Sequence, residues 1–164
     1  MLSGETAVGH YPVQTVQTMV RIALRAETGG APWRRPTTGE LRPLNIAASV
    51  AQAATQIATE LGAKAILCPT ASGYTARMVA RFRPPAPVVA VTPDPQVQRR
   101  LALVWGVIPL IAPRQDNTDL LIADALQVAR AHGVLSTGDL VVISAGTAGQ
   151  APGTTDLLLV RKVP

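Results

Sequence analysis

Residues able to bind an anion are concentrated in segment 70–75, within the stretch CPTASGYTARMVARFRP. Thr70, Ser72 and Thr75 supply hydroxyl groups, and Gly73 lets the backbone approach a ligand closely. An Arg-bearing helical pattern follows directly, and the unpaired N–H groups at the start of a helix favour an anion. The segment therefore predicts a phosphoryl-binding site. The alternative interpretation is that Ser72 only caps its own helix, because the spacing of the common nucleotide-binding loops is absent.

A second segment rich in glycine and threonine, residues 146–155, follows the fourth apolar run of the chain. It is predicted to fold over the same site as an effector loop. The alternative is a flexible connection between two strands. The residues that carry this prediction are Gly146, Gly149, Gly153, Thr154 and Thr155.

Candidate catalytic residues are few. His10 lies outside the predicted α/β domain, and His132 is expected at a helix C-terminus, where a partly cationic ring suits the helix dipole. Three aspartates near the start of one predicted helix are interpreted as solvated charges: Asp116, Asp119 and Asp124. No set of His and carboxylates has the spacing of metal ligands, so no metal site is predicted. The residues alone indicate a binding domain rather than an enzyme.

Composition bounds the class of protein. The chain has 164 residues, 48% of them hydrophobic, which predicts one domain with a real core and room for an appendage. The single cysteine, Cys68, lies in an apolar run, so it is expected to be buried and excludes an internal disulfide. Neither a membrane span nor a signal peptide is apparent, which predicts a cytoplasmic protein. The net charge of +5 is scattered, and no nucleic-acid partner is expected.

The apolar periodicity predicts the elements that position these residues. Residues 12–27 form a helix that begins at Pro12, and residues 29–43 read as a linker. Further helices are predicted at 44–61, 74–82, 94–104 and 117–131. Short apolar strands are predicted at 64–70, 87–92, 107–112, 139–146 and 156–163.

Strands that read as continuous apolar runs between helices indicate a parallel sheet covered on both faces. The fifth strand follows the fourth without a helix, so it is expected to return antiparallel at the edge. The predicted fold is a three-layer α/β/α sandwich with a five-stranded, mostly parallel sheet. The predicted organisation is a separate segment 1–28, the linker 29–43 and an α/β domain 44–164.

The opening, MLSGETAVGHYPVQTVQTMVRIA, resembles the end of the catalytic barrel of pyruvate kinases. The stretch ILCPTASGYTARMVARFRPPAPVVAVTPDPQVQRRLALVWGVIPLI, then GDLVVISAG and GTTDLLLV, resembles that family's C-terminal domain in the same order. The resemblance covers essentially the whole chain, with the linker 29–43 as its loosest part. It implies that residues 1–28 are a remnant of the barrel, its final loop and helix.

The resemblance also implies what the chain does and what it lacks. The full-length enzyme converts phosphoenolpyruvate and ADP to pyruvate and ATP, with Mg²⁺ and K⁺ as cofactors. Ser3 and Glu5 match catalytic residues of the family, whereas the residues that hold metal, phosphoenolpyruvate and nucleotide lie in the missing barrel. The chain alone is therefore expected to be inactive, with no cofactor of its own.

In the family, the C-terminal domain binds phosphorylated allosteric effectors and contributes to a subunit interface. By resemblance, Thr70, Ser72, Gly73 and Thr75 match the phosphate-holding turn, and residues 146–154 match the effector loop. Family members regulated by fructose bisphosphate carry a Lys and an Arg where this chain has Ala71 and Tyr74. This implies a monophosphate effector, such as AMP, ribose 5-phosphate or glucose 6-phosphate, or a vestigial site.

Three interpretations remain open from the sequence. The first is a regulatory and oligomerising domain that forms a homo-oligomer. The second is one half of a split enzyme that is completed by a separately encoded barrel. The third is a scaffold whose exposed helix, residues 12–27, binds a partner or a second copy.

Overall fold

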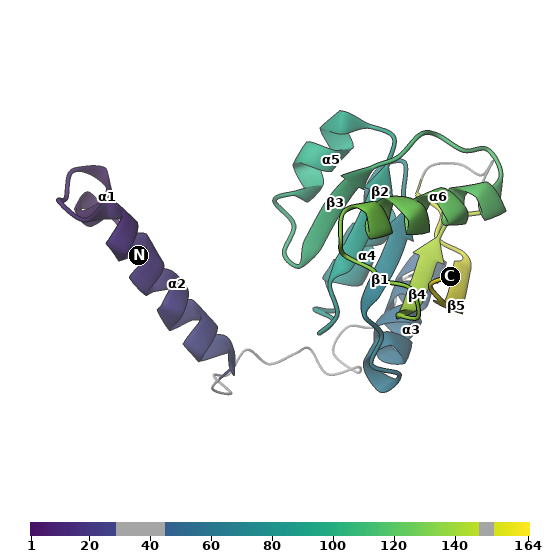
Figure 1. Ribbon diagram of the computed structural model, residues 1–164, viewed down its shortest axis with the longest axis horizontal. Helices are drawn as coiled ribbons and strands as arrows, with labels where there is room; N and C mark the ends of the chain where they lie inside the picture. The colour runs from purple at the N-terminus through teal and green to yellow at the C-terminus, as the bar shows by residue number, and fades with distance from the viewer. Residues whose placement is uncertain (29–44, 148–152) are drawn as a thin grey trace. The chain divides into compact units, whose positions relative to one another are not determined.

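The structure is a computed structural model that describes residues 1–28, 45–147 and 153–164 (Figure 1). The chain divides into two compact units, Met1–Thr37 and Thr38–Pro164. The predicted linker 29–43 and Gly149 lie outside the described residues.

The first unit contains two helices, α1 (Gly4–Ala7) and α2 (Pro12–Thr28). The predicted helix begins at Pro12, where the missing N–H leaves no helical hydrogen bond unmade. The short helix α1 was not predicted, because four residues are too few to show a periodic apolar pattern. Neither helix has a buried residue.

The described part of the second unit alternates strands with helices. The strands are β1 (Ala65–Pro69), β2 (Val88–Thr92), β3 (Val107–Ile111), β4 (Leu140–Ala145) and β5 (Leu157–Lys162). The helices are α3 (Ile46–Glu60), α4 (Tyr74–Ala80), α5 (Pro95–Leu101) and α6 (Thr118–Ala131). All five predicted strands are present, and helices α4 and α5 end two or three residues earlier than predicted.

The strands form one sheet in the order β3-β2-β1-β4-β5. Strands β1 to β4 are parallel, with Leu67 opposite both Val89 and Ile143, and β5 pairs antiparallel with β4. The prediction of a mostly parallel sheet with an antiparallel edge strand is therefore confirmed. The carboxyl ends of four parallel strands meet at one edge, which is where ligands bind in open α/β sheets.

Alternate residues of the strands pack against different helices, so the sheet has a core on both faces. Ile66 and Cys68 belong to the core formed with α3, α4 and α5, whereas Leu67 and Ile143 belong to the core formed with α6 (Figure 1). The three-layer sandwich is thus confirmed. Cys68 is fully buried as predicted, and burial raises the pKa of its thiol well above the usual range.

Three helices of this unit begin at side-chain caps. Asn45 accepts a hydrogen bond from the backbone N–H of Ala48, Asp94 from that of Gln96, and Asn117 from those of two residues in α6. The caps at Asp94 and Asn117 fix where α5 and α6 begin after β2 and β3, and therefore where these two loops at the carboxyl edge end.

Within the described ranges, no helix combines the length and apolar composition that crossing a membrane requires.

Candidate functional site

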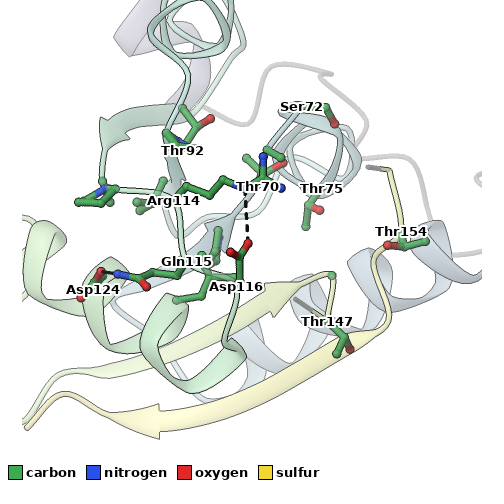
Figure 2. Close-up of a pocket in the computed structure, with 18 of the residues that line it drawn as sticks. Thr70, Ser72, Thr75, Thr92, Arg114, Gln115, Asp116, Asp124, Thr147 and Thr154 are labelled. Carbon is green, nitrogen blue, oxygen red and sulfur yellow. Dashed lines mark hydrogen bonds and ion pairs between the residues drawn. The ribbon is translucent and has the colours of Figure 1, made fainter. Parts of the chain in front are cut away.

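A pocket of about 250 Å³ opens at the carboxyl ends of β1, β2, β3 and β4 (Figure 2). Its walls come from the β1–α4 turn, the end of β2, the β3–α6 loop and the segment after β4. Six of the predicted site residues line it: Thr70, Ser72, Thr75, Gly146, Gly153 and Thr154. The two segments that the sequence analysis linked only through a predicted topology therefore meet in one cavity.

The β1–α4 turn is shaped by Gly73. This residue is the N-cap of α4 and has φ +76°, a left-handed conformation that favours glycine. A Cβ there would lie 3.0 Å from Cδ2 of Leu101, so the position is also sterically closed. The N–H of Gly73 donates to Oγ1 of Thr70 at 3.0 Å, which tightens the turn.

The alternative interpretation of Ser72 as a helix cap is wrong, since the cap position is Gly73 and no side chain caps α4. Among the described residues, the Ser72 hydroxyl has no hydrogen-bond partner. It lines the pocket, so it is available to a ligand. Gly73 itself is buried beneath the lining and acts through the shape of the turn.

The segment after β4 is attached to the β1–α4 side of the pocket. The hydroxyls of Thr75 and Thr155 are 2.7 Å apart and buried. A Cβ at Gly146 would overlap the carbonyl oxygen of Thr154, so only glycine allows the two ends of this segment to approach. Thr147 donates both its backbone N–H and its hydroxyl to Asp156.

Sequence reasoning missed the opposite wall of the pocket. It is formed by Thr92 at the end of β2 and by four polar residues of the β3–α6 loop and helix α6: Arg114, Gln115, Asp116 and Asp124. The sequence could have indicated this wall, because residues 113–116 follow the carboxyl end of a predicted parallel strand, where ligands bind in such sheets.

The interpretation of Asp124 as a solvated helix charge is wrong. Its carboxylate lines the pocket, is half-buried, and accepts a hydrogen bond of 2.6 Å from Nε2 of Gln115. Helix periodicity places Asp124 near a helix start but does not show that the preceding loop folds back against it. Asp119, by contrast, is exposed in the first turn of α6, as predicted.

Arg114 is the cation of the described lining. Its Nε lies 3.5 Å from Oδ1 of Asp116, and both side chains are more than four-fifths exposed. An ion pair so exposed contributes little to stability and exchanges readily for another anion. Arg114 lines the same pocket as the hydroxyl-bearing residues Thr70, Ser72 and Thr75 (Figure 2).

The remaining predicted residues lie elsewhere. Ser3 and Glu5 are exposed in the first unit, where the Ser3 carbonyl accepts the N–H groups of Thr6 and Ala7 at the start of α1. His132 is the C-cap of α6, as predicted, and its Nδ1 lies 2.9 Å from the carbonyl oxygen of Val128. In the parts of the chain that the structure describes, no group of three or more His, Cys, Asp and Glu residues could hold a metal ion.

The chain is similar to known proteins over nearly all of its length. The family described as the alpha/beta domain of pyruvate kinase matches residues 48–161. Pyruvate kinases from Geobacillus stearothermophilus and Lactobacillus delbrueckii subsp. bulgaricus are 43% and 42% identical over 99% and 96% of this chain. The pyruvate kinase of Clostridium acetobutylicum is 40% identical over 99% of it.

The chain spans 28%, 27% and 35% of the length of these three relatives, so it corresponds to only a part of each. The α/β/α fold, the match over residues 48–161 and the identity along both units lead to the same conclusion. This chain belongs to the pyruvate kinase family and contains its alpha/beta domain.

Proposed function

We propose that this chain is the regulatory and oligomerising part of a pyruvate kinase, and that its pocket binds a phosphorylated effector. The observation that carries the proposal is that two separate parts of the chain line one cavity at the carboxyl edge of the sheet: the turn 70–75, and the described residues on both sides of 148–152, namely Gly146, Thr147, Gly153 and Thr154. This edge is the usual ligand position in open α/β sheets. Among the described residues, the Ser72 hydroxyl in this pocket has no hydrogen-bond partner, so a ligand can use it.

A phosphoryl group fits the wall formed by Thr70, Ser72 and Thr75. Hydroxyls donate to phosphate oxygens, and Arg114 can replace its exposed pairing with Asp116 by a stronger, charge-assisted bond to phosphate. The described lining carries a single cation, Arg114, against two carboxylates, Asp116 and Asp124. This balance supports a monophosphate, such as AMP, ribose 5-phosphate or glucose 6-phosphate.

Calorimetric titration of the chain with these three monophosphates tests the pocket directly. Binding by at least one of them, weakened in Ser72→Ala, supports the proposal, because this substitution removes a free hydroxyl without removing a structural hydrogen bond. Ser136→Ala is the matched control, since Ser136 is exposed in the α6–β4 connection at the other end of the sheet. No heat with any of the three at millimolar concentration would reject an effector role.

The parent reaction, phosphoenolpyruvate and ADP to pyruvate and ATP, belongs to the full-length enzyme in this proposal, with Mg²⁺ and K⁺ bound by the barrel. Because the chain spans about a third or less of the three relatives, we expect it to form no pyruvate alone. An assay with and without a separately produced barrel tests this. Activity of the chain alone would contradict the proposal, and activity only of the mixture would identify one half of a split enzyme.

Oligomerisation is supported by the edge strand β5. Val163 donates to the carbonyl of Asp139 across the ladder, so the alternating N–H of Val160 faces away from β4. The other edge is blocked, because Pro109 in β3 has no N–H and its carbonyl accepts Nε2 of Gln98 at 3.3 Å.

We expect Val160→Pro to lower the oligomeric state measured by light scattering, because it removes a donor from the open edge only. Ile111→Pro, in the blocked edge strand, is the comparison and should leave the oligomeric state unchanged, since Ala112 donates to Thr92 in β2 and the alternating N–H of Ile111 therefore faces away from the sheet. A monomeric parent chain would contradict this part of the proposal.

A further inference from the structure

The basic residues of the described second unit are concentrated in one part of its sequence. Residues 61–115 contain six arginines and Lys64, against a single acidic residue, Asp94. Residues 116–164 have the opposite balance, with three basic and five acidic residues. Asp94 is already engaged as the N-cap of α5, where it accepts the N–H of Gln96 at 2.7 Å. The elements from β1 to β3 therefore carry a positive charge that their own carboxylates do not offset.

The fold gathers five of these arginines on one face of the sheet and its adjoining edge. Helices α4 and α5 both pack against one core, whereas α6 packs against the core on the opposite face (Figure 1). The two helices also approach each other, since a Cβ at Gly73, just before α4, would contact Leu101 in α5. This charge is scattered in the sequence only because β2 separates the two helices. The basic surface is defined as the arginines of α4, of α5 and of the turn after α4: Arg77, Arg81, Arg83, Arg99 and Arg100.

Most guanidinium groups of the basic surface are not neutralised within the described chain. Arg77, Arg99 and Arg100 are exposed, and Arg81 is half-buried. Among the described residues, these four form no ion pair with a carboxylate. The helix dipole favours cations in a last turn, which accounts for Arg99 and Arg100 as structural charges. It does not account for the absence of carboxylates along both helices.

Two aromatic rings border the basic surface at the edge where β2 and β3 begin. Cζ of Arg83 lies 4.5 Å from the centroid of the Trp105 ring, and Cζ of Arg81 lies 5.5 Å from that of Phe82. Trp105 remains 46% exposed. Arg83 has φ +50°, a left-handed conformation that is unfavourable for a residue with a Cβ and is typical of functional positions. The surface therefore combines cations with an accessible aromatic ring.

This combination matches the chemistry of a single-stranded nucleic acid. Arginine binds phosphate oxygens in a bidentate manner, and six of the seven basic residues in 61–115 are Arg rather than Lys. Bases stack on aromatic rings and on guanidinium planes with little dependence on sequence. A membrane-binding helix instead needs a continuous apolar face, and the large apolar side chains exposed between α5 and β3 are only Leu103 and Trp105. The surface therefore fits a nucleic acid better than an anionic membrane.

We propose that the basic surface binds single-stranded nucleic acid without sequence specificity. Its arginines pair with the phosphates, and Trp105, held by Arg83, stacks against a base. This interaction is separate from the proposed effector site, because none of the residues of the basic surface lines the pocket.

The experiment measures the fluorescence anisotropy of a labelled oligouridylate of about 15 nucleotides, titrated with the 164-residue chain. We expect binding that weakens with salt, with a slope of log K against log salt of about −3 for four phosphate contacts. Arg100→Ala should reduce the magnitude of this slope by about 0.7, the value for one phosphate of a single strand. Arg130→Ala is the matched control and should leave the slope unchanged. Both arginines are exposed in the last turn of a helix, but the two helices cover opposite faces of the sheet.

Trp105→Ala tests the stacking separately from the charge. It should weaken binding by about tenfold, the loss expected for one stacked base, and leave the salt slope unchanged. Circular dichroism checks that the variant is folded. An oligothymidylate of the same length distinguishes the source of the ligand: tighter binding of one oligonucleotide assigns RNA or DNA, and equal binding supports single strands in general.

Three results would overturn the proposal. The first is absence of binding by either oligonucleotide at about 50 mM salt, alone or together with binding to vesicles of anionic lipid, which would assign the surface to a membrane. The second is an equal loss of slope in Arg100→Ala and Arg130→Ala, because the charge of the whole chain would then attract the strand. The third is unchanged affinity in Trp105→Ala, since a surface that binds by charge alone accepts any polyanion.

Discussion

Helices α2 and α3 have similar lengths, 17 and 15 residues, but opposite roles in their units. Helix α3 buries five alanines, three of them in the core that it shares with the sheet, whereas α2 buries no residue and leaves Val16, Val20 and Leu24 about half exposed. Both carry apolar residues at helical spacing. The difference lies in what each unit supplies: the sheet of the second unit covers α3, and the described part of the first unit has no surface that covers α2.

This comparison shows that a periodic apolar pattern predicts a helix but not its partner. Most helical stability in proteins comes from packing of the apolar face rather than from propensity. The second unit should therefore unfold cooperatively, and the first should contribute little to that transition. The same rigid second unit positions the loops of the pocket.

The largest expected difference is in thiol reactivity. Cys68 is fully buried and its pKa is raised, so it should react with a disulfide reagent only when the second unit opens. A thiol introduced by Val20→Cys, at a position 50% exposed, should react at once. Typical equilibrium constants for folding predict that the two thiols react at rates at least about a thousandfold apart.

Both reaction rates are measured in one sample of the Val20→Cys variant, from the time course of the thiol that the reagent releases. Urea provides the control, because unfolding the second unit should make Cys68 react as fast as the introduced cysteine. Two equally fast thiols in native buffer would show that the second unit is not cooperatively folded.

The second-largest expected difference is between the effects of a core substitution and a surface substitution on the free energy of unfolding. Leu67→Ala removes a side chain with no exposed surface from the centre of β1, and it should lower the free energy of unfolding by about 2–5 kcal/mol. Leu24→Ala, in α2, should change it by less than about 0.5 kcal/mol, because that side chain is 57% exposed. Urea denaturation followed by circular dichroism measures both. Equal losses would mean that α2 is packed in solution.

The smallest expected effect concerns the turn that shapes the pocket. Gly73 and Gly133 have φ of +76° and +69°, so alanine at either costs about 1–2 kcal/mol in this left-handed conformation. Only at Gly73 does the new Cβ also meet Leu101 and Arg77, and nothing lies within 4 Å at Gly133.

Gly73→Ala should therefore be the less stable of the two variants, and it alone should weaken binding of glucose 6-phosphate. Chemical denaturation and calorimetry of the two purified variants measure these effects. Equal stability and equal affinity would show that the turn tolerates a side chain.

Much of the fold could be predicted from the sequence. Continuous apolar strands such as VVAVT and capping residues such as Asp94 carry local signals, and the missing helix before β5 correctly predicted its antiparallel return. The hydroxyl wall of the pocket was found because Thr70 and Thr75 surround a glycine at a strand–helix junction.

The acidic wall could not be predicted in the same way. The hydrogen bond between Gln115 and Asp124 joins residues nine positions apart, and it depends on how the β3–α6 loop folds over the start of α6. Helix periodicity describes Asp124 relative to its own helix only. Contacts between a loop and a neighbouring element therefore decided the chemistry of the site, and no local pattern records them.

The most direct test of the central claim, that this carboxyl-edge pocket binds a phosphorylated ligand, is an amide NMR titration with glucose 6-phosphate. The account predicts saturable shifts for the backbone amides of residues 70–75 and 114–116, with the amides of α2 unaffected. Absence of shifts at millimolar ligand, or shifts confined to residues outside the pocket, would contradict it.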